Sequence, residues 1–295
     1  MIRRILSLVV ALVASVLGTL SLWTGGTTLA FVAGSFRSGG RIDPGALALV
    51  ALGLLLLVIA VWSVVLSSLG VIVVGAIQVI VGFVSILSPF EIAQGPLPVL
   101  YQLINQLFGP NSPVNFGFYA SVPTGVGIAV GTVLLVGGIA ARVRSAVPSQ
   151  FWRIFSPILS VILGGIGLLI LVGQGGVVYT SQLQRASWNV DFGVVGAVVL
   201  GMLLLAVAAF TVRWSSIGLF VLGAIVTTFG LATLFQSNLI RAALTPVSQE
   251  LASAFAMWSG NGNFALVGLV LLAMGLAVRV RARRRFTGAE ASTTV

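Results

Sequence analysis

The chain has 295 residues, of which 58% are hydrophobic and only 7% are charged. A water-soluble domain carries about 25% charged residues, so the composition excludes that class and indicates an all-α integral membrane protein. The sequence contains no cysteine and no histidine, which excludes disulfides, thiolate nucleophiles, the usual zinc sites and histidine general bases. We therefore expect no enzymatic activity, no metal and no cofactor.

Eight apolar segments are long enough to cross a bilayer, since a span needs about 20 apolar residues at about 1.5 Å each. The uncharged block 45–87 would be about 65 Å long as one helix, so it has to fold back, and the small residues at 67–70 predict the turn. The predicted spans are 5–22, with a possible extension to 31, then 45–66, 70–88, 120–141, 154–174, 192–212, 216–236 and 263–279.

The arginines predict the orientation of these spans. With both termini on the cytoplasmic side, eleven of the 15 arginines face the cytoplasm, and the outer four are Arg37, Arg41, Arg185 and Arg241. Four of the five acidic residues fall outside, so the whole net charge of +10 lies on the inner face. We expect a multi-pass protein of the plasma membrane with cytoplasmic termini, and no nucleic-acid partner.

The two halves of the chain repeat one pattern. Between residues 52 and 82, 15 of 31 residues are identical to those 148 positions later, and Gly75 corresponds to Gly223. The shift is 149 in the first span and falls to 137 in the last, where Gly138 corresponds to Gly275. This predicts a tandem duplication of a four-helix unit, with repeats 1–148 and 149–285 and a disordered cytoplasmic tail 286–295.

Each unit has an even number of spans, so the copies should be parallel and related by a pseudo-two-fold axis along the membrane normal. The repeat also bears on the N-terminus, which resembles a signal peptide. Because residues 4–26 match the internal segment 153–175, we expect an uncleaved first helix.

Two charged pairs recur on the outer side at the same spacing, Arg37 with Asp43 and Arg185 with Asp191. Each aspartate stands just before an apolar helix, where it can accept hydrogen bonds as an N-cap while the arginine pairs with it or with headgroups. The alternative is a ring that binds a polar ligand between the halves.

Each large outer loop, 89–117 and 237–262, predicts a short amphipathic helix. Apolar residues repeat at helical spacing, as in Leu103 with Leu107 and Leu251 with Trp258, and Pro98 and Pro246 fit a first helical turn. Such helices lie in the lipid interface or cap the bundle. A gate or a surface that docks a partner is the alternative.

No predicted span carries a charge at mid-depth, whereas ion-coupled transporters usually do. A path between the repeats would therefore be lined by uncharged groups, Gln78, Ser85, Thr227 and Thr228, although hydroxyls also bond to their own helix. The arginines after the last span should contact anionic lipids on the cytoplasmic face: Arg279, Arg281, Arg283, Arg284 and Arg285.

The leading hypothesis is a non-enzymatic scaffold or complex subunit that acts through helix packing and interfacial contacts with other membrane proteins. The alternative is a facilitator for an uncharged or amphipathic small molecule that passes between the two repeats. A water-accessible cavity lined by the four polar residues would favour the facilitator, and a sealed, dry centre would favour the scaffold.

Overall fold

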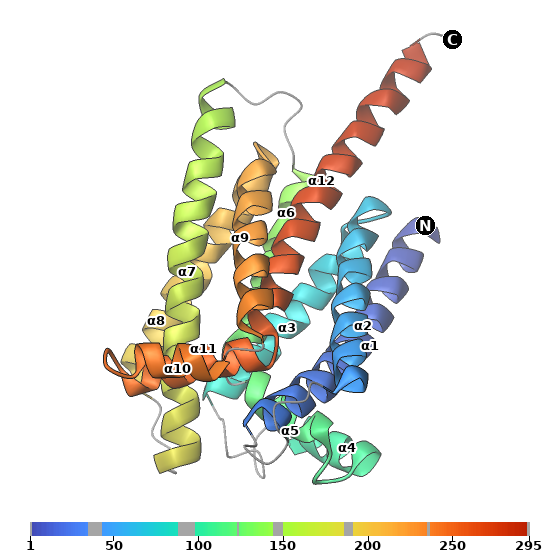
Figure 1. Cartoon of the computed structure of the whole chain (residues 1–295). Helices are drawn as coiled ribbons and strands as arrows, with labels where there is room; N and C mark the ends of the chain where they lie inside the picture. The colour runs from blue at the N-terminus through green and yellow to red at the C-terminus, as the bar shows by residue number, and fades with distance from the viewer. Residues whose placement is uncertain are drawn as a thin grey trace.

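A computed structural model describes residues 2–34, 43–87, 98–122, 124–143, 150–185, 191–234 and 237–293. In these ranges every regular element is helical. The long helices are α1 (Ile2–Gly34), α2 (Pro44–Trp62), α3 (Leu69–Leu87), α6 (Val126–Arg142), α7 (Gln150–Arg185), α8 (Phe192–Phe210), α9 (Ile217–Thr233) and α12 (Asn263–Thr293). Figure 1 shows that α1 begins and α12 ends at the same end of the bundle.

Six of these helices are long and apolar enough to cross a membrane: α1, α2, α3, α7, α8 and α12. The other two predicted spans, 120–141 and 216–236, correspond to α6 and α9, which have 17 residues each. At about 1.5 Å per residue each measures about 26 Å, short of the hydrocarbon thickness of about 30 Å. Helix α6 starts late because Gly125 precedes it at φ +81°, a left-handed conformation that does not continue a helix.

The turn between α2 and α3 lies where the small residues predict it. A 3-10 turn at Ser63–Val65 ends α2, and α3 starts at Leu69. The hydroxyl of Ser7 on α1 donates to the carbonyl oxygens of Ser63 at 3.1 Å and Ser67 at 2.6 Å. The carbonyl oxygen of Ser63 also accepts from the amides of Leu66 and Ser67, so the hydroxyl of Ser7 adds a bond that ties α1 to the turn.

A 3-10 turn bonded by a serine of the preceding long helix recurs 148 residues later. A 3-10 turn at Thr211–Arg213 ends α8, and α9 starts at Ile217. The hydroxyl of Ser156 on α7 donates to the carbonyl oxygen of Thr211 at 3.2 Å. The two helix hairpins are therefore joined to the preceding long helix in the same way.

The C-terminal end of the chain differs from the expectation. Helix α12 continues through the arginines to Thr293, beyond the predicted end of the span at 279 and through most of the tail 286–295 that the sequence predicts to be disordered. Alanine, arginine and glutamate are good helix formers and no proline interrupts them, so a helix that is already nucleated continues.

Each half is built on the same helix pairs: α1 packs along α2 and α3 along α6, while α7 packs along α8 and α9 along α12. Glycines allow the close crossings. A Cβ atom on Gly75 would lie 2.7 Å from the carbonyl oxygen of Gly131, and one on Gly223 would lie 2.8 Å from that of Gly268. Such close backbone contact drives helix association where lipid offers no hydrophobic force.

Contacts between the halves are reciprocal. Helix α6 packs on α8 of the other half, and α12 packs on α2. A Cβ on Gly26 of α1 would lie 2.7 Å from the carbonyl oxygen of Asn261, and one on Gly175 of α7 would meet the carbonyl oxygen of Thr124. The two contacts are equivalent: α1 and α7 are the first long helices of their halves, and Asn261 and Thr124 each lie two residues before the last long helix of the other half, α12 or α6.

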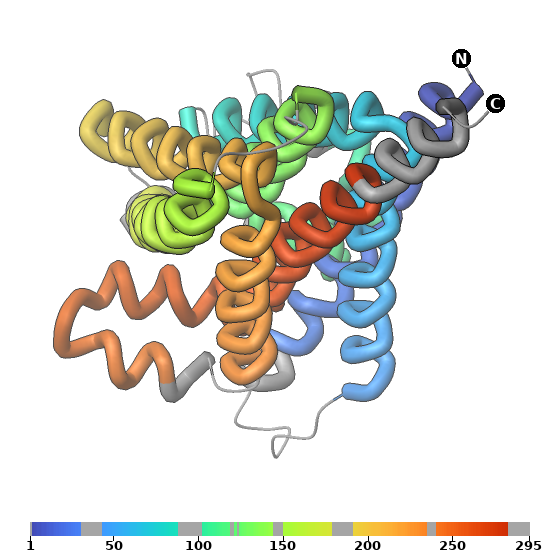
Figure 2. The backbone as a smooth tube through the Cα atoms, turned by 90° about the horizontal axis from the view of Figure 1, so that it is seen from above, coloured from blue at the N-terminus to red at the C-terminus, as the bar shows by residue number. Residues whose placement is uncertain are grey.

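Two pairs of short helices lie toward the opposite end of the bundle from the start of α1 (Figure 1). They are α4 (Pro98–Phe108) with α5 (Pro113–Ser121), and α10 (Ser237–Leu244) with α11 (Gln249–Gly260). Seen from above, the α10–α11 hairpin lies on one flank of the bundle beside α7 (Figure 2).

The two predicted amphipathic helices correspond to α4 and α11, and one detail of the second was wrong. Pro98 begins α4 as expected, but Pro246 lies in a turn and Ser248 is the N-cap of α11, accepting from the amide of Leu251 at 3.3 Å. Val247, which we expected on the apolar face, is 75% exposed. Helix α11 starts after Ser248 rather than at Pro246 because the serine side-chain oxygen accepts from a free amide of the first turn.

Candidate functional site

The four polar residues predicted to line a path between the halves do not come together. Only Gln78 lines a cavity. The hydroxyls of Ser85 and Thr227 donate to carbonyl oxygens of their own helices, those of Val81 and Gly223, both at 2.7 Å. Thr228 is exposed on α9. These hydroxyls bond within their own helices because a backbone carbonyl one turn earlier is within reach and no second helix is needed.

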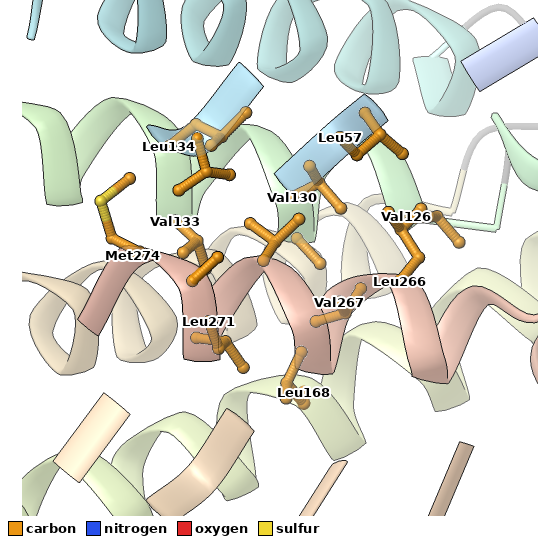
Figure 3. Close-up of a cluster of buried hydrophobic side chains, with 14 of the residues drawn as sticks. Leu57, Val126, Val130, Val133, Leu134, Leu168, Leu266, Val267, Leu271 and Met274 are labelled. Carbon is orange, nitrogen blue, oxygen red and sulfur yellow. The ribbon is translucent and has the colours of Figure 1, made fainter. Parts of the chain in front are cut away.

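The centre between the halves is filled by apolar side chains. Figure 3 shows α6 and α12 facing each other, with Val133 and Leu271 in contact range of the same cluster and Leu57 and Leu168 closing it from α2 and α7. Val133 and Leu271 are both 0% exposed. The centre is therefore closed around Val133 and Leu271, whereas Val126, Val130 and Leu266 of the same cluster border a cavity.

A cavity of about 420 Å³ lies beside this cluster, mostly within the first half, and it reaches Asn263 and Leu266 of the second half. It is enclosed by α1, α3, α4, α5 and α6, and the start of α12 closes one side. The apolar wall includes Leu12, Val16, Leu20, Trp23, Val74, Ile77, Val81, Ile104, Leu107, Phe108, Phe118, Val122, Val126 and Leu266. Its volume is in the usual range for a small-molecule site.

Five polar residues also line this mostly apolar cavity, and two of them carry carboxamides: Ser15, Thr19, Gln78, Ser121 and Asn263. Asn263 is 1% exposed, and neither its Oδ1 nor its Nδ2 has a hydrogen-bond partner among the described residues. The Nε2 of Gln78 donates to the hydroxyl of Ser15 at 3.4 Å, while its Oε1 has no such partner. Buried polar groups are nearly always bonded, so these atoms indicate a ligand position.

Helix α4 covers the cavity with one side of its apolar face. Ile104 is 6% exposed and points into the cluster with Phe118, while Leu107 on the same helix is 66% exposed. The helix is held at its end by Asn115, whose Nδ2 donates to Oδ1 of Asn105 at 2.5 Å and to the carbonyl oxygen of Gly109 at 2.6 Å. This cover rests on few buried side chains.

The second half places aromatic rings at the corresponding positions. The cavity is lined by Val81, Ser121 and Gly127. The shift of 148 pairs Val81 with Phe229, and the shift of 137 pairs Ser121 with Trp258 and Gly127 with Phe264. The ring of Phe264 lies 5.1 Å from that of Phe229 and 5.2 Å from that of Trp258.

The ring contacts of this cluster meet at Phe264, and its most deeply buried member is Trp258. Trp258 is 0% exposed, and its indole Nε1 donates to the carbonyl oxygen of Thr124 in the first half at 3.2 Å. The predicted interfacial helix α11 is thus packed into the bundle, with Ala252, Ala254 and Trp258 buried. It caps the bundle, which is one of the two roles expected for such a helix.

The outer aspartates cap helices as predicted. The Oδ1 of Asp43 accepts from the amide of Gly45 at 2.9 Å, and that of Asp191 accepts from the amide of Gly193 at 2.8 Å. Both carboxylates are exposed. Arg37 and the side chain of Arg185 lie outside the described residues, so the predicted pairs are not described.

Basic residues gather at the end where α1 begins. Arg3, Arg4 and Arg281 line a cleft of about 520 Å³ together with Ser67. Arg281 also donates from Nη1 to the carbonyl oxygen of Val64 at 2.9 Å, and Arg279 is exposed. The side chains of Arg283, Arg284 and Arg285 lie outside the described residues.

The chain matches no protein-family model, no curated protein and no solved structure in the comparisons made. The assignment of a function therefore depends on the geometry alone. Sequence reasoning missed the cavity and Asn263; it placed Trp258 on the apolar face of a helix but not in a cluster of rings. The sequence feature that could have indicated the cavity is the difference between the two repeats at Val81, Ser121 and Gly127, where the second repeat has aromatic residues.

Proposed function

We propose that this protein is a non-enzymatic, multi-pass membrane protein that serves as a structural subunit of a membrane assembly. The closed centre between α6 and α12 is the observation that carries the proposal. A transport path between the halves would need polar groups on a continuous wall, and the hydroxyls expected there bond within their own helices. The outer aspartates are assigned to capping because each accepts from a helix amide.

The architecture we propose is eight spans in two parallel copies of a four-helix unit. Equivalent glycine crossings at Gly75 and Gly223, equivalent serine bonds from Ser7 and Ser156, and the reciprocal contacts of Gly26 and Gly175 support it. Reciprocity of this kind is the mark of a two-fold relation. Helices α6 and α9 are short for a span, but 17 residues lie at the lower limit of observed lengths.

We propose that the protein lies in the plasma membrane with the arginine-lined cleft on the cytoplasmic side. Arg3, Arg4 and Arg281 converge there, which suits phosphate groups of anionic lipids. The arginine distribution along the sequence supports the same orientation.

Long apolar stripes on α1 and α7 are the surfaces offered to lipid or to partner proteins. On α7 the exposed residues Ile154, Ile158, Ile162 and Ile166 repeat every four positions, and Val9 and Val13 do so on α1. A photoreactive amino acid placed singly at Ile158, Ile162 or Val9 tests the proposal in cells. A discrete protein adduct from one stripe is expected, and adducts with lipid alone from every position would contradict a subunit role.

The cavity favours a second candidate, a facilitator for uncharged or amphipathic molecules, because it holds unpartnered carboxamide atoms beside an apolar wall. Flux of glycerol into liposomes that contain the purified protein separates the two candidates. The subunit role predicts the flux of empty liposomes, and a saturable acceleration would favour the facilitator.

A further inference from the structure

We infer that the cavity of the first half is a binding site for one uncharged, single-chain amphiphile with a hydroxyl-bearing head, the chemistry of a monoacylglycerol. The chain lies between α1, α3 and α4, and the head bonds to the carboxamide of Asn263. This inference goes beyond the proposed function and does not depend on it.

The shape of the cavity suits a single apolar chain. Its lining on α1 extends from Leu12 to Trp23, a length of about 16 Å at 1.5 Å per residue. On α3 the lining extends from Val74 to Gly82, about 12 Å along the helix. A long and mostly apolar volume of about 420 Å³ accepts an acyl chain better than a compact polar solute.

The head group follows from the polar atoms. The residues that line the cavity include no arginine and no acid, so no counter-charge is present for an ionic head, and a buried unpaired charge is costly. Asn263 offers two N–H donors and an acceptor oxygen, all without described partners. A hydroxyl both donates and accepts, so it satisfies the carboxamide in either of its orientations. A ketone or quinone carbonyl would leave Oδ1 without a donor.

The comparison of the halves shows that an apolar filling was available to this fold. In the second half the ring of Phe264 packs against Phe229 and Trp258; Trp258 and Phe264 are buried, and Phe229 is 40% exposed. Valine, serine and glycine at the corresponding positions leave the first half open. An empty cavity of this size loses packing contacts on every wall, and a bound chain would restore them.

Helix α4 is the cover that would admit the ligand. Leu103 and Leu107 line the cavity yet are 48% and 66% exposed, so their side chains bridge the cavity and the surroundings. Its attachment through Asn115 of α5 involves Asn105, in the C-terminal half of α4, and Gly109, in the turn between α4 and α5. A chain can therefore enter beneath α4 while that turn stays bonded.

The test uses the full-length protein in lipid nanodiscs and a monoacylglycerol that carries bromine on its acyl chain as the probe. Bromine quenches tryptophan on contact, and Trp23 lines the cavity. The difference in quenching between the natural protein and Trp23→Phe isolates the signal from the cavity. We expect saturable quenching of Trp23 by the uncharged probe and much weaker quenching by the matching brominated fatty acid.

Variants taken from the opposite half test the two parts of the site. Asn263→Val introduces the residue found at the corresponding position, Val126, and should weaken binding about 5- to 10-fold, as the loss of one or two hydrogen bonds predicts. The double variant Val81→Phe with Gly127→Phe should abolish saturable quenching. A Cβ at Gly127 would meet only Gln78 and Gly82, at 3.4 Å or more, so the backbone tolerates a side chain there.

Thr228→Val is the matched control, since Thr228 is exposed on α9 away from the cavity, and it should leave binding unchanged. If the double variant fails to fold, Asn263→Val alone decides the question. Equal quenching in Asn263→Val and the natural protein, stronger quenching by the fatty acid, or quenching that never saturates would each overturn the inference. None of these outcomes bears on the cross-linking of α1 and α7.

Discussion

The two pairs of short helices at one end of the bundle cover their halves in opposite ways. Helix α11 inserts Trp258, which is fully buried, against Phe264. Among the side chains of α4 that the structure describes, those at 102–108, Ile104 alone is buried, and the helix spans a cavity of about 420 Å³. Two similar frames thus differ in three positions where aromatic residues replace valine, serine and glycine. Packing volume, rather than helix arrangement, separates a closed half from an open one.

Removal of Trp258 should have the largest effect on stability. Trp258→Ala removes a fully buried ring and its bond to the carbonyl of Thr124, at a cost of about 3–5 kcal/mol in the free energy of unfolding. The matched variant on α4 is Leu107→Ala, at a side chain that is 66% exposed, and it should cost less than about 1 kcal/mol. Thermal unfolding in one detergent measures both, and equal losses would contradict the comparison.

The glycine crossings should respond equally in the two halves. Gly75→Val and Gly223→Val each force a side chain against backbone atoms of the neighbouring helix, which costs about 1–3 kcal/mol. Gly196→Ala on α8 is the control, because a Cβ there meets nothing within 4 Å, and it should gain about 0.5–1 kcal/mol. Unequal losses from the two valine variants, measured by chemical unfolding, would weaken the proposed duplication.

The aspartate caps should also behave alike, with smaller effects. Asp43→Ala and Asp191→Ala each remove one bond to a helix amide and should cost about 0.5–2 kcal/mol. Asparagine at either position should recover much of the loss, because its side-chain oxygen still accepts. Normal stability of an asparagine variant together with loss of function in the cell would show that these residues do more than cap.

The sequence predicted the elements that depend on local chemistry. Apolar length predicted the long helices, small residues predicted the turn before α3, and the spacing of Asp43 and Asp191 predicted two caps. The late start of α6 and the burial of Trp258 could not be predicted, because both depend on how distant helices fit. Asn263 looked like a loop residue at the edge of a span, and only packing places its carboxamide in a cavity.

The proposed architecture also fixes which turns share a side of the membrane. Leu66 and Trp214 lie in the turns that join the two helices of equivalent hairpins. Asn111 and Val247 lie between the short helices at the other end of the bundle and are exposed. Because the chain has no cysteine, a single introduced cysteine reports its own side.

Labelling of four single-cysteine variants in intact cells with a membrane-impermeant thiol reagent tests this architecture most directly. Asn111→Cys and Val247→Cys should react, while Leu66→Cys and Trp214→Cys should react only after the membrane is opened. This result is expected if the halves are parallel copies with both covers outside. Reaction of Leu66→Cys but not of Trp214→Cys in intact cells would show that the halves are inverted and would contradict the account.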